Sequence, residues 1–193
     1  MPERTPSQTV GPYLHIGLTQ GVFARREIFG PEVAAPGIAG SHIRIEGRVF
    51  DGVGAPMPDA LVETWQADAQ GRYAHPADGR PLASNSFRGF GRCATDKDGH
   101  FYVRTIKPGR VAGQTGLQAA HINVGLFARG MQKRLFTRIY FGGDPDLAED
   151  AILALVPAER RHTLLAQPDP HRSGLYRFDI HLQGPEETVF FDA

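Results

Sequence analysis

The chain has almost no cysteine, no long apolar run and no excess charge of either sign, and these absences exclude several classes of protein. Cys93 is its only cysteine among 193 residues, so no disulfide can form within the chain. Lysine plus arginine and aspartate plus glutamate both number 21, which leaves no net charge to attract a nucleic acid. No segment approaches the roughly 18 consecutive apolar residues of a membrane span, and the start lacks a signal peptide's apolar core. We therefore expect a cytoplasmic protein with neither nucleic acid nor membrane as a partner.

The length and the distribution of proline and glycine indicate one domain preceded by an arm. A chain of 193 residues buries roughly 70% of its unfolded surface, so it needs no disulfide or metal to hold its core. The first 40 residues are rich in proline, glycine and polar residues and lack regular periodicity. We predict an extended N-terminal arm over residues 1–40 and a folded domain over residues 41–193.

Within the domain, apolar residues alternate with polar ones over short runs separated by Gly and Pro turns, as half-buried strands require. This pattern predicts strands at 43–50, 60–67, 101–106, 121–128, 135–141 and 176–183. Several short strands with such turns indicate a mainly β fold, a mixed-topology β-sandwich. Helix is expected only near 145–166, where Asp144 can cap the start and Pro145 suits the first turn. Pro157 should interrupt it and leave two short helices.

The most informative residues are His121 and Asn123, because side chains two apart on a strand point to the same face. Histidines at both positions would chelate a metal, whereas His-x-Asn supplies half of such a clamp. Considered alone, His121 is a packed strand histidine and Tyr73 an aromatic covering a turn. The sequence holds no H-E-x-x-H motif, no Cys/His zinc spacing and no serine in a nucleophile elbow. The glycines around Phe90 lack the strand-to-helix context of a phosphate loop and are interpreted as turn glycines.

The order of several fragments along the chain carries a family resemblance. These fragments are TPSQTVGPY (5–13), WQADAQGRY (65–73), FRGFGR (87–92), TIKPG (105–109), AHIN (120–123), TRIYF (137–141) and ETVFFD (187–192). Together they resemble the intradiol ring-cleavage dioxygenases, from Thr5 to the C-terminus. Members of that family hold one non-haem Fe(III) with two tyrosines and two histidines, a ligand set that suits a hard ferric ion.

The resemblance implies that this chain has lost its own metal. Tyr73 matches the first tyrosine ligand and His121 the first histidine, whereas Val111 and Asn123 stand at the other two positions. Valine has no donor atom, and the asparagine amide is a weak neutral ligand. The pattern is similar to that of two-chain family members, in which a homologous beta chain binds the catalytic Fe(III). We expect this chain to bind none alone.

The resemblance also implies a role for the chain at the partner's active site. The positions that would line the partner's cavity are Thr9, Gly11, Pro12 and Tyr13 of the arm, and Arg129. Glycine and proline allow close approach to a small aromatic, and an arginine suits the carboxylate of an aromatic substrate. The expected enzyme is a higher hetero-oligomer that opens 3,4-dihydroxybenzoate with O2 to 3-carboxy-cis,cis-muconate. Arg129 could instead form only a surface or interface salt bridge.

Two other interpretations are open. A single-chain intradiol enzyme would need a full ligand set, and Val111 and Asn123 speak against it. The other is a stand-alone binding or spacer module, because prealbumin-like β-sandwich domains without chemistry share the pattern from Ile45 to Gly109. Co-purification with a homologue bearing the two missing ligands would separate a subunit from a module.

Overall fold

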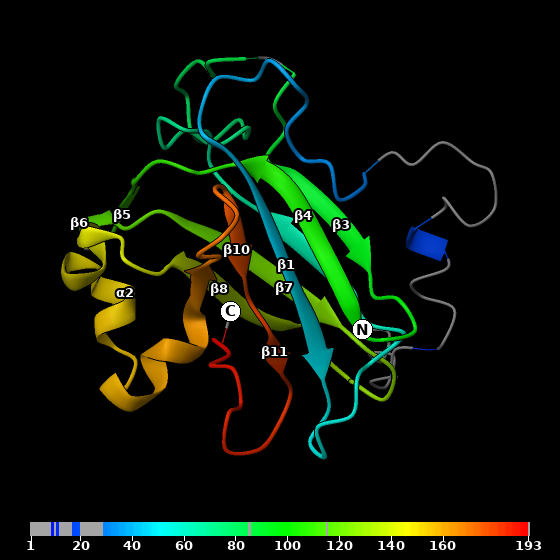
Figure 1. Cartoon of the computed structure of the whole chain (residues 1–193). Coiled ribbons are helices and arrows are strands. Elements are labelled where there is room, and N and C mark those ends of the chain that lie inside the picture. The colour runs from blue at the N-terminus through cyan, green and yellow to red at the C-terminus, as the bar shows by residue number, and fades with distance from the viewer. Residues whose placement is uncertain are drawn as a thin grey trace, which may run out of the picture.

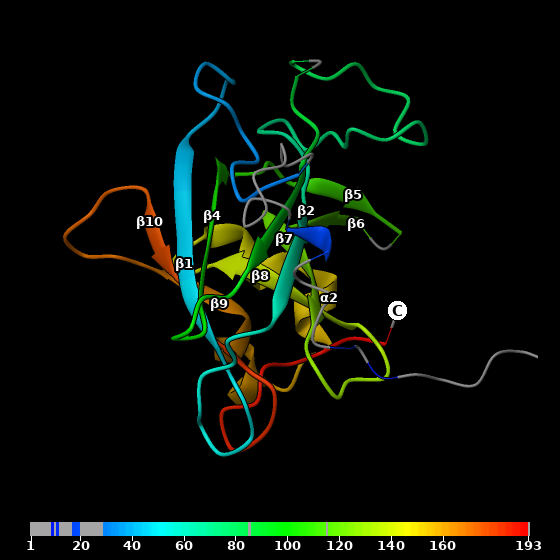
Figure 2. The same ribbon diagram turned by 90° about the vertical axis from the view of Figure 1, so that its right-hand side faces the viewer.

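A computed structural model provides the structure, which describes residues 9, 11, 17–19, 29–84, 86–114 and 116–192. The strands form two layers, and short helical segments lie beside them (Figures 1 and 2). The strands are β1 (His42–Phe50), β2 (Leu61–Trp65), β3 (Phe90–Ala94), β4 (His100–Ile106), β5 (Val111–Gly113), β6 (Gly116–Gln118), β7 (His121–Phe127), β8 (Leu135–Phe141), β9 (Leu165–Pro168), β10 (Leu175–Arg177) and β11 (Ile180–His181). After β8 come the 3-10 helices η2 (Pro145–Glu149) and η3 (Ala158–Leu164), and the α-helix α2 (Ala151–Ala154).

The strand order confirms the predicted mainly β fold and its mixed topology. One layer contains β3, β2, β7 and β8, which pair antiparallel in that order. β8 then pairs with β9 in parallel, β9 with β10 antiparallel, β10 with β1 in parallel, and β1 with β4 antiparallel. β5 and β6 form a separate hairpin. The arrangement of the two layers is compatible with a sandwich.

Alternation along the strands separates the core from the outer face of the β7 layer. Ile45 on β1 and Ile122 on β7 are fully buried in the same apolar core, and Val124 joins them. Residues of odd number on β7 must therefore point to the other side of the sheet. His121 and Asn123 lie on this outer face, so we expect the functional site there.

Most strand predictions agree with the structure to within two residues, but the run 176–183 was wrong as a single strand. It divides into β10 and β11, because the backbone leaves regular pairing between them. The Phe178 N–H donates to the Glu46 carbonyl, and the Asp179 carboxylate accepts from the Arg48 N–H at 2.8 Å. A side chain thus replaces one bond of the ladder.

The strands β3, β5, β6 and β9 were not predicted. In β3 the misleading residue was Gly91, which was interpreted as a turn glycine although it lies inside the strand. A Cβ added there would lie 2.3 Å from the Cγ2 atom of Val33. This glycine therefore serves close packing against the N-terminal segment, and Gly89, with φ 69°, is the one that turns.

The predicted helical region forms three short segments instead of two helices. Asp144 caps η2 as expected, accepting the Asp146 N–H at 3.1 Å, and Pro145 occupies the first turn. Pro157 precedes η3 and confirms the interruption. The additional break comes from Asp150, whose side chain caps a new turn, α2. No helix in these described ranges is long and apolar enough to cross a membrane.

Part of the predicted arm packs on the domain. The Val33 N–H donates to the Arg104 carbonyl at 2.8 Å, and Val33, Ala34 and Ile38 are buried against β4. Pro12 and Tyr13 lie outside the described residues. The boundary between residues 1–40 and 41–193 stays a prediction.

Candidate functional site

The outer face of the β2, β7 and β8 strands carries the candidate site. Asn123 in the middle strand pairs with Trp65 on one side and with Arg138 on the other. His121 pairs with Tyr140 in the neighbouring row, and their ring centroids are 5.7 Å apart. Cross-strand partners share a face, so these five side chains belong to one surface.

A tight turn brings Tyr73 to this surface. The Asp68 Oδ1 atom accepts the backbone N–H groups of Gln70 at 2.8 Å and Arg72 at 3.0 Å, which closes the turn. Gly71 has φ 74°, and a Cβ added there would lie 1.8 Å from the Arg110 carbonyl oxygen. Only glycine meets both demands, so the two loops are locked together.

Tyr73 and Asn123, which stand at two of the four matched positions, are in contact. The Tyr73 ring stacks on Trp65 with centroids 5.8 Å apart. The Asn123 Nδ2 atom donates to the Tyr73 hydroxyl at 3.5 Å and to the Trp65 carbonyl at 3.4 Å. Burial raises the pKa of Tyr73, although the Asn123 hydrogen bond and the Arg138 charge act against this rise. The phenol is therefore neutral at neutral pH.

Val111 lies in the β5–β6 hairpin next to this face. It is 6% exposed and pairs with Gln118. The Gln118 Oε1 atom accepts a hydrogen bond from the Arg138 guanidinium at 3.1 Å, which links the hairpin to β8. The Val111 side chain carries no donor atom for a metal.

His121 is held in one orientation by its surroundings. It is 2% exposed, and its Nδ1 atom lies 2.8 Å from the Ala119 carbonyl oxygen. A carbonyl only accepts, so Nδ1 carries the proton and Nε2 does not. Burial, followed by the nearby Arg138 charge, lowers the pKa of His121 to about 4. The imidazole is neutral at neutral pH.

A buried polar network behind the site was not predicted from the sequence. The Tyr140 hydroxyl donates to the Asp150 Oδ1 atom at 3.2 Å and is 3.3 Å from the Arg138 Nη1 atom. Burial raises the pKa of Tyr140 to about 12. Asp150 also accepts the Ala119 N–H at 2.8 Å. Period-two alternation over 135–141 was a usable signal, because it places Arg138 and Tyr140 on one face.

The residues at the four matched positions do not fit a ferric ion. Val111 has no donor, Asn123 offers a neutral amide, and the Arg138 guanidinium is close enough to perturb the pKa values of Tyr73 and His121. Within the described ranges, no group of three or more His, Cys, Asp or Glu side chains could hold a metal.

The low pKa of His121 predicts acid-dependent stability. The unfolded chain binds a proton near pH 6.5, whereas the folded imidazole does so near 4, so protons favour the unfolded state between these values. The contribution is fully present above pH 6.5 and is lost as the pH falls toward 4. At pH 4.5 we expect a loss of about 2.5 kcal/mol relative to pH 7. Urea denaturation of the wild type and His121→Asn at both pH values measures it, because the variant removes this one term. Equal pH dependence in the two proteins would contradict the assignment.

Arg129 lies apart from this face. It follows the other end of β7, so six residues of strand, roughly 20 Å, and a turn separate it from His121. Its Nε atom is 3.5 Å from the Asp59 Oδ2 atom, and its side chain is 61% exposed. In the single chain Arg129 thus forms the surface ion pair that was the alternative to a substrate role. Thr9 and Gly11 are exposed.

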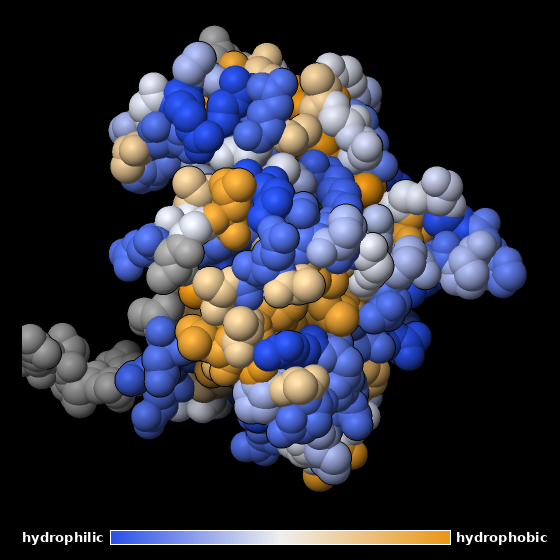
Figure 3. Space-filling model, turned by 90° about the vertical axis from the view of Figure 1, so that its left-hand side faces the viewer, coloured by the Kyte–Doolittle hydropathy of each residue, from blue (hydrophilic) through white to orange (hydrophobic). Residues whose placement is uncertain are grey.

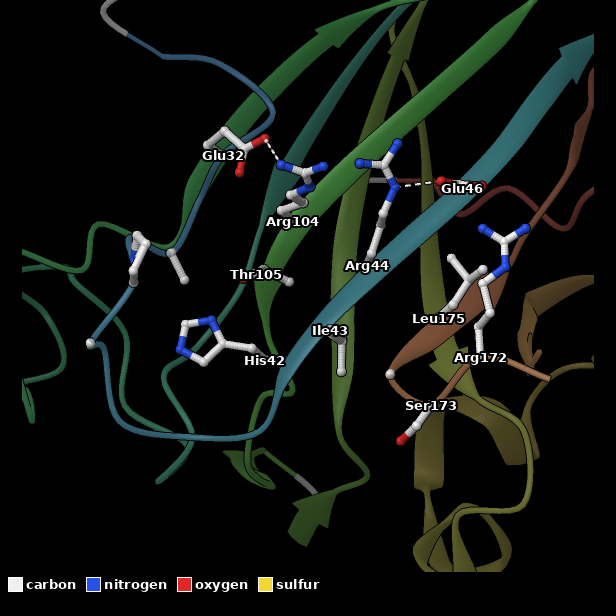
Figure 4. Close-up of a pocket in the computed structure, with 14 residues that line it drawn as sticks. Glu32, His42, Ile43, Arg44, Glu46, Arg104, Thr105, Arg172, Ser173 and Leu175 are labelled. Carbon is white, nitrogen blue, oxygen red and sulfur yellow. Dashed lines mark hydrogen bonds and ion pairs between the residues drawn. The ribbon is translucent and has the colours of Figure 1, made fainter. Parts of the chain in front are cut away.

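A cavity of about 850 Å³ lies on the other layer, beside β1, β4 and β10 (Figure 4). Arg44 on β1 and Arg104 on β4 are cross-strand neighbours on the cavity wall. Their like charges repel each other unless they are neutralised. Carboxylates provide that neutralisation, because Glu46 pairs with Arg44, and Glu32 lies 3.2 Å from Arg104. The cavity contains none of the four matched positions.

Apolar side chains gather on the face that carries β5, β6 and α2, near the middle of the view in Figure 3. Two exposed large apolar residues belong to these segments or follow them, Leu117 at 54% and Leu155 at 79% exposure. A groove of about 560 Å³ here is lined partly by Gln118 and Ile152. Exposed apolar area of this kind is typical of surfaces that a partner covers.

Comparison with known proteins gives consistent matches. Residues 32–184 match the dioxygenase family. The chain is 46% identical to the protocatechuate 3,4-dioxygenase alpha chain of Burkholderia cepacia, over 99% of this chain and 98% of that one. It is 41% identical to the beta chain of the same species, over 77% of this chain and 67% of that one. The dioxygenase domain of a dioxygenase carbohydrate-binding protein fusion from Streptomyces sp. SirexAA-E matches with TM-score 0.63 and 28% identity, covering 94% of this chain and 99% of that one.

Proposed function

The chain belongs to the intradiol ring-cleaving dioxygenase family, and we propose that it is the alpha subunit of a protocatechuate 3,4-dioxygenase. The observation that carries the proposal is that two of the four matched iron-ligand positions hold other residues while the fold of the family is retained. Tyr73 and His121 remain on the outer face of the sheet, while Val111 and Asn123 replace the other two ligands. The complete enzyme opens 3,4-dihydroxybenzoate with O2 to 3-carboxy-cis,cis-muconate, and the homologous beta chain supplies the Fe(III).

The extent of the similarity favours the alpha chain over the other family members. The alignment with the alpha relative runs over nearly the whole of both chains, whereas that with the beta relative leaves a third of the beta chain uncovered. A catechol 1,2-dioxygenase from Acinetobacter baylyi is 32% identical, and this chain covers 49% of its length. These proportions support a subunit over a single-chain enzyme.

In this proposal the chain forms one wall of the beta chain's substrate cavity. Its contributions are Thr9, Gly11, Pro12 and Tyr13 of the arm and Arg129 after β7. Gly11 has no atom within 4 Å of an added Cβ, and the Arg129 side chain is mostly exposed, so both are accessible to a second chain. Arg129 would bring a fixed cation to the substrate carboxylate.

Iron content tests the assignment directly. Expressed alone, the chain should contain no stoichiometric iron and lack the visible tyrosinate-to-Fe(III) absorption, because two of four ligands are missing. Co-expressed with the iron-bearing homologue, it should elute from gel filtration as a complex. Interfaces between permanently associated subunits commonly bury more than ~2,000 Å². Tyr73→Phe in this chain should leave the iron of the complex unchanged. Stoichiometric iron in the chain alone would contradict the proposal, and an apparent monomer in the presence of the homologue would favour the stand-alone module.

A further inference from the structure

The cavity beside β1, β4 and β10 contains an arginine whose charge the protein leaves unpaired. Arg172 lies in the turn between β9 and β10, is exposed, and lines the cavity (Figure 4). Among the residues that the structure describes, no carboxylate forms an ion pair with its guanidinium. Asp169, the nearest acidic residue in the chain, accepts the Arg172 backbone N–H at 3.1 Å and forms its ion pair with Arg177 at 3.3 Å. One cation of the cavity is therefore available to a ligand.

A second arginine of the cavity is held in position and has donors to spare. The guanidinium carbon of Arg44 lies 4.2 Å from the centre of the Tyr102 ring, and its Nε atom donates to Glu46. Glu46 also accepts from Arg177 at 2.6 Å, so two guanidiniums share its charge. In the described part of the chain, Nε is the one side-chain nitrogen of Arg44 that forms a hydrogen bond. Its two terminal nitrogens can therefore bind a further acceptor while the existing contacts remain.

Apolar surface lies between these two arginines. Leu175 is the register partner of Arg44 across β1 and β10, and it is only 5% exposed. Figure 4 shows the Leu175 side chain between those of Arg44 and Arg172. The cavity, of about 850 Å³, has further apolar lining from Ala34, Pro36 and Ile43. It thus offers a ligand both positive charge and an apolar surface beside that charge.

We propose that this cavity binds a small organic monocarboxylate, with the carboxylate between Arg44 and Arg172 and an apolar body against Leu175. A guanidinium binds a carboxylate through two parallel N–H···O bonds. The lining includes three arginines and two glutamates, so one negative charge balances these five residues. An inorganic anion would gain nothing from the apolar lining, and a neutral ligand would gain nothing from the charge of Arg172. This inference does not depend on the proposed function.

Equilibrium dialysis tests the site in the complex with the iron-bearing homologue, with isotopically labelled cyclohexanecarboxylate as the probe. We expect saturable binding of one molecule per pair of chains. Acetate lacks the apolar body and cyclohexylmethanol lacks the charge, so both should compete poorly with the probe.

Variants of the cavity arginine separate charge from other effects. Arg172→Gln should lower the affinity for the probe by about tenfold to a hundredfold, because one charge-assisted contact is lost. Arg172→Lys keeps the charge without the planar fork and should bind with intermediate affinity. Arg48→Gln is the matched control, because Arg48 lies on the same strand as Arg44 but outside the cavity lining, and it should bind as the wild type does. Thermal unfolding of each complex verifies that the variants fold.

Three results would contradict the proposal. The first is no saturable binding to the folded wild-type complex, and the second is equal affinity in Arg172→Gln and the wild type. The third is loss of binding in Arg129→Ala with full binding in Arg172→Gln, which would place the probe in the substrate cavity of the proposed function. Competition by acetate as strong as that by unlabelled probe would overturn the assignment of an apolar body.

Discussion

Replacing Asp150 with alanine is expected to lower the free energy of unfolding by about 3 to 5 kcal/mol. The side chain is 1% exposed and accepts hydrogen bonds from the Ile152 N–H at 2.9 Å and the Leu153 N–H at 2.7 Å, which cap α2. It also accepts the Ala119 N–H and the Tyr140 hydroxyl. Loss of a cap costs about 1 kcal/mol, and each buried donor left without an acceptor costs about 1 to 3 kcal/mol.

Chemical denaturation of the Asp150 variants measures this loss against two controls. Asp150→Asn retains one acceptor oxygen but turns an amide N–H toward one of the donors, so it should lie between the wild type and Asp150→Ala. Glu149→Ala, next in the chain, removes an exposed ion pair with Arg110 and should change stability by less than about 0.5 kcal/mol. A loss below about 1 kcal/mol for Asp150→Ala would mean that this network does not hold α2 on the sheet.

The longer strands could be predicted from the sequence because core apolar residues recur along them at every second position. The bounds of β7 and β8 were found almost to the residue, although the second face of both strands is largely buried as well. β5 and β6 are three residues each, too short for a period to emerge. Their pairing depends on contacts with distant parts of the chain, such as the Arg138–Gln118 hydrogen bond, which local alternation does not encode.

The site could be predicted in part for a similar reason. His121 and Asn123 share a strand face by their spacing alone, and the structure confirms that they lie together on the outer surface. The contact of Tyr73 with Asn123 depends on a turn that folds back over the sheet, so only the family resemblance pointed to it. The role of Asp150 could not be predicted from the sequence, because Tyr140 and Ala119, which donate to its side chain, lie about 10 and about 30 residues away in the chain.

Arg129→Ala in the co-expressed complex is expected to raise the KM for 3,4-dihydroxybenzoate by about tenfold to a hundredfold, which corresponds to loss of one charge-assisted contact. The KM for catechol, which lacks the carboxylate, should change much less. Asp59→Asn is the matched control, because it breaks the ion pair seen at 3.5 Å and keeps the arginine. A purely structural role would make the two variants behave alike, whereas a substrate role would separate them.

Gly11→Val tests the part of the proposed cavity wall that the arm contributes. Its effect on the kinetic constants should differ from that of Arg129→Ala. An added Cβ at Gly11 meets nothing within 4 Å, so the variant should fold as the wild type does. If the arm closes over the substrate ring, the larger side chain crowds it, and both kcat and kcat/KM should fall for either catechol. Steady-state kinetics with iron measured in the same samples separates this from metal loss. Unchanged kinetics in both Gly11→Val and Arg129→Ala at full iron occupancy would mean that this chain contributes assembly and no part of the substrate cavity.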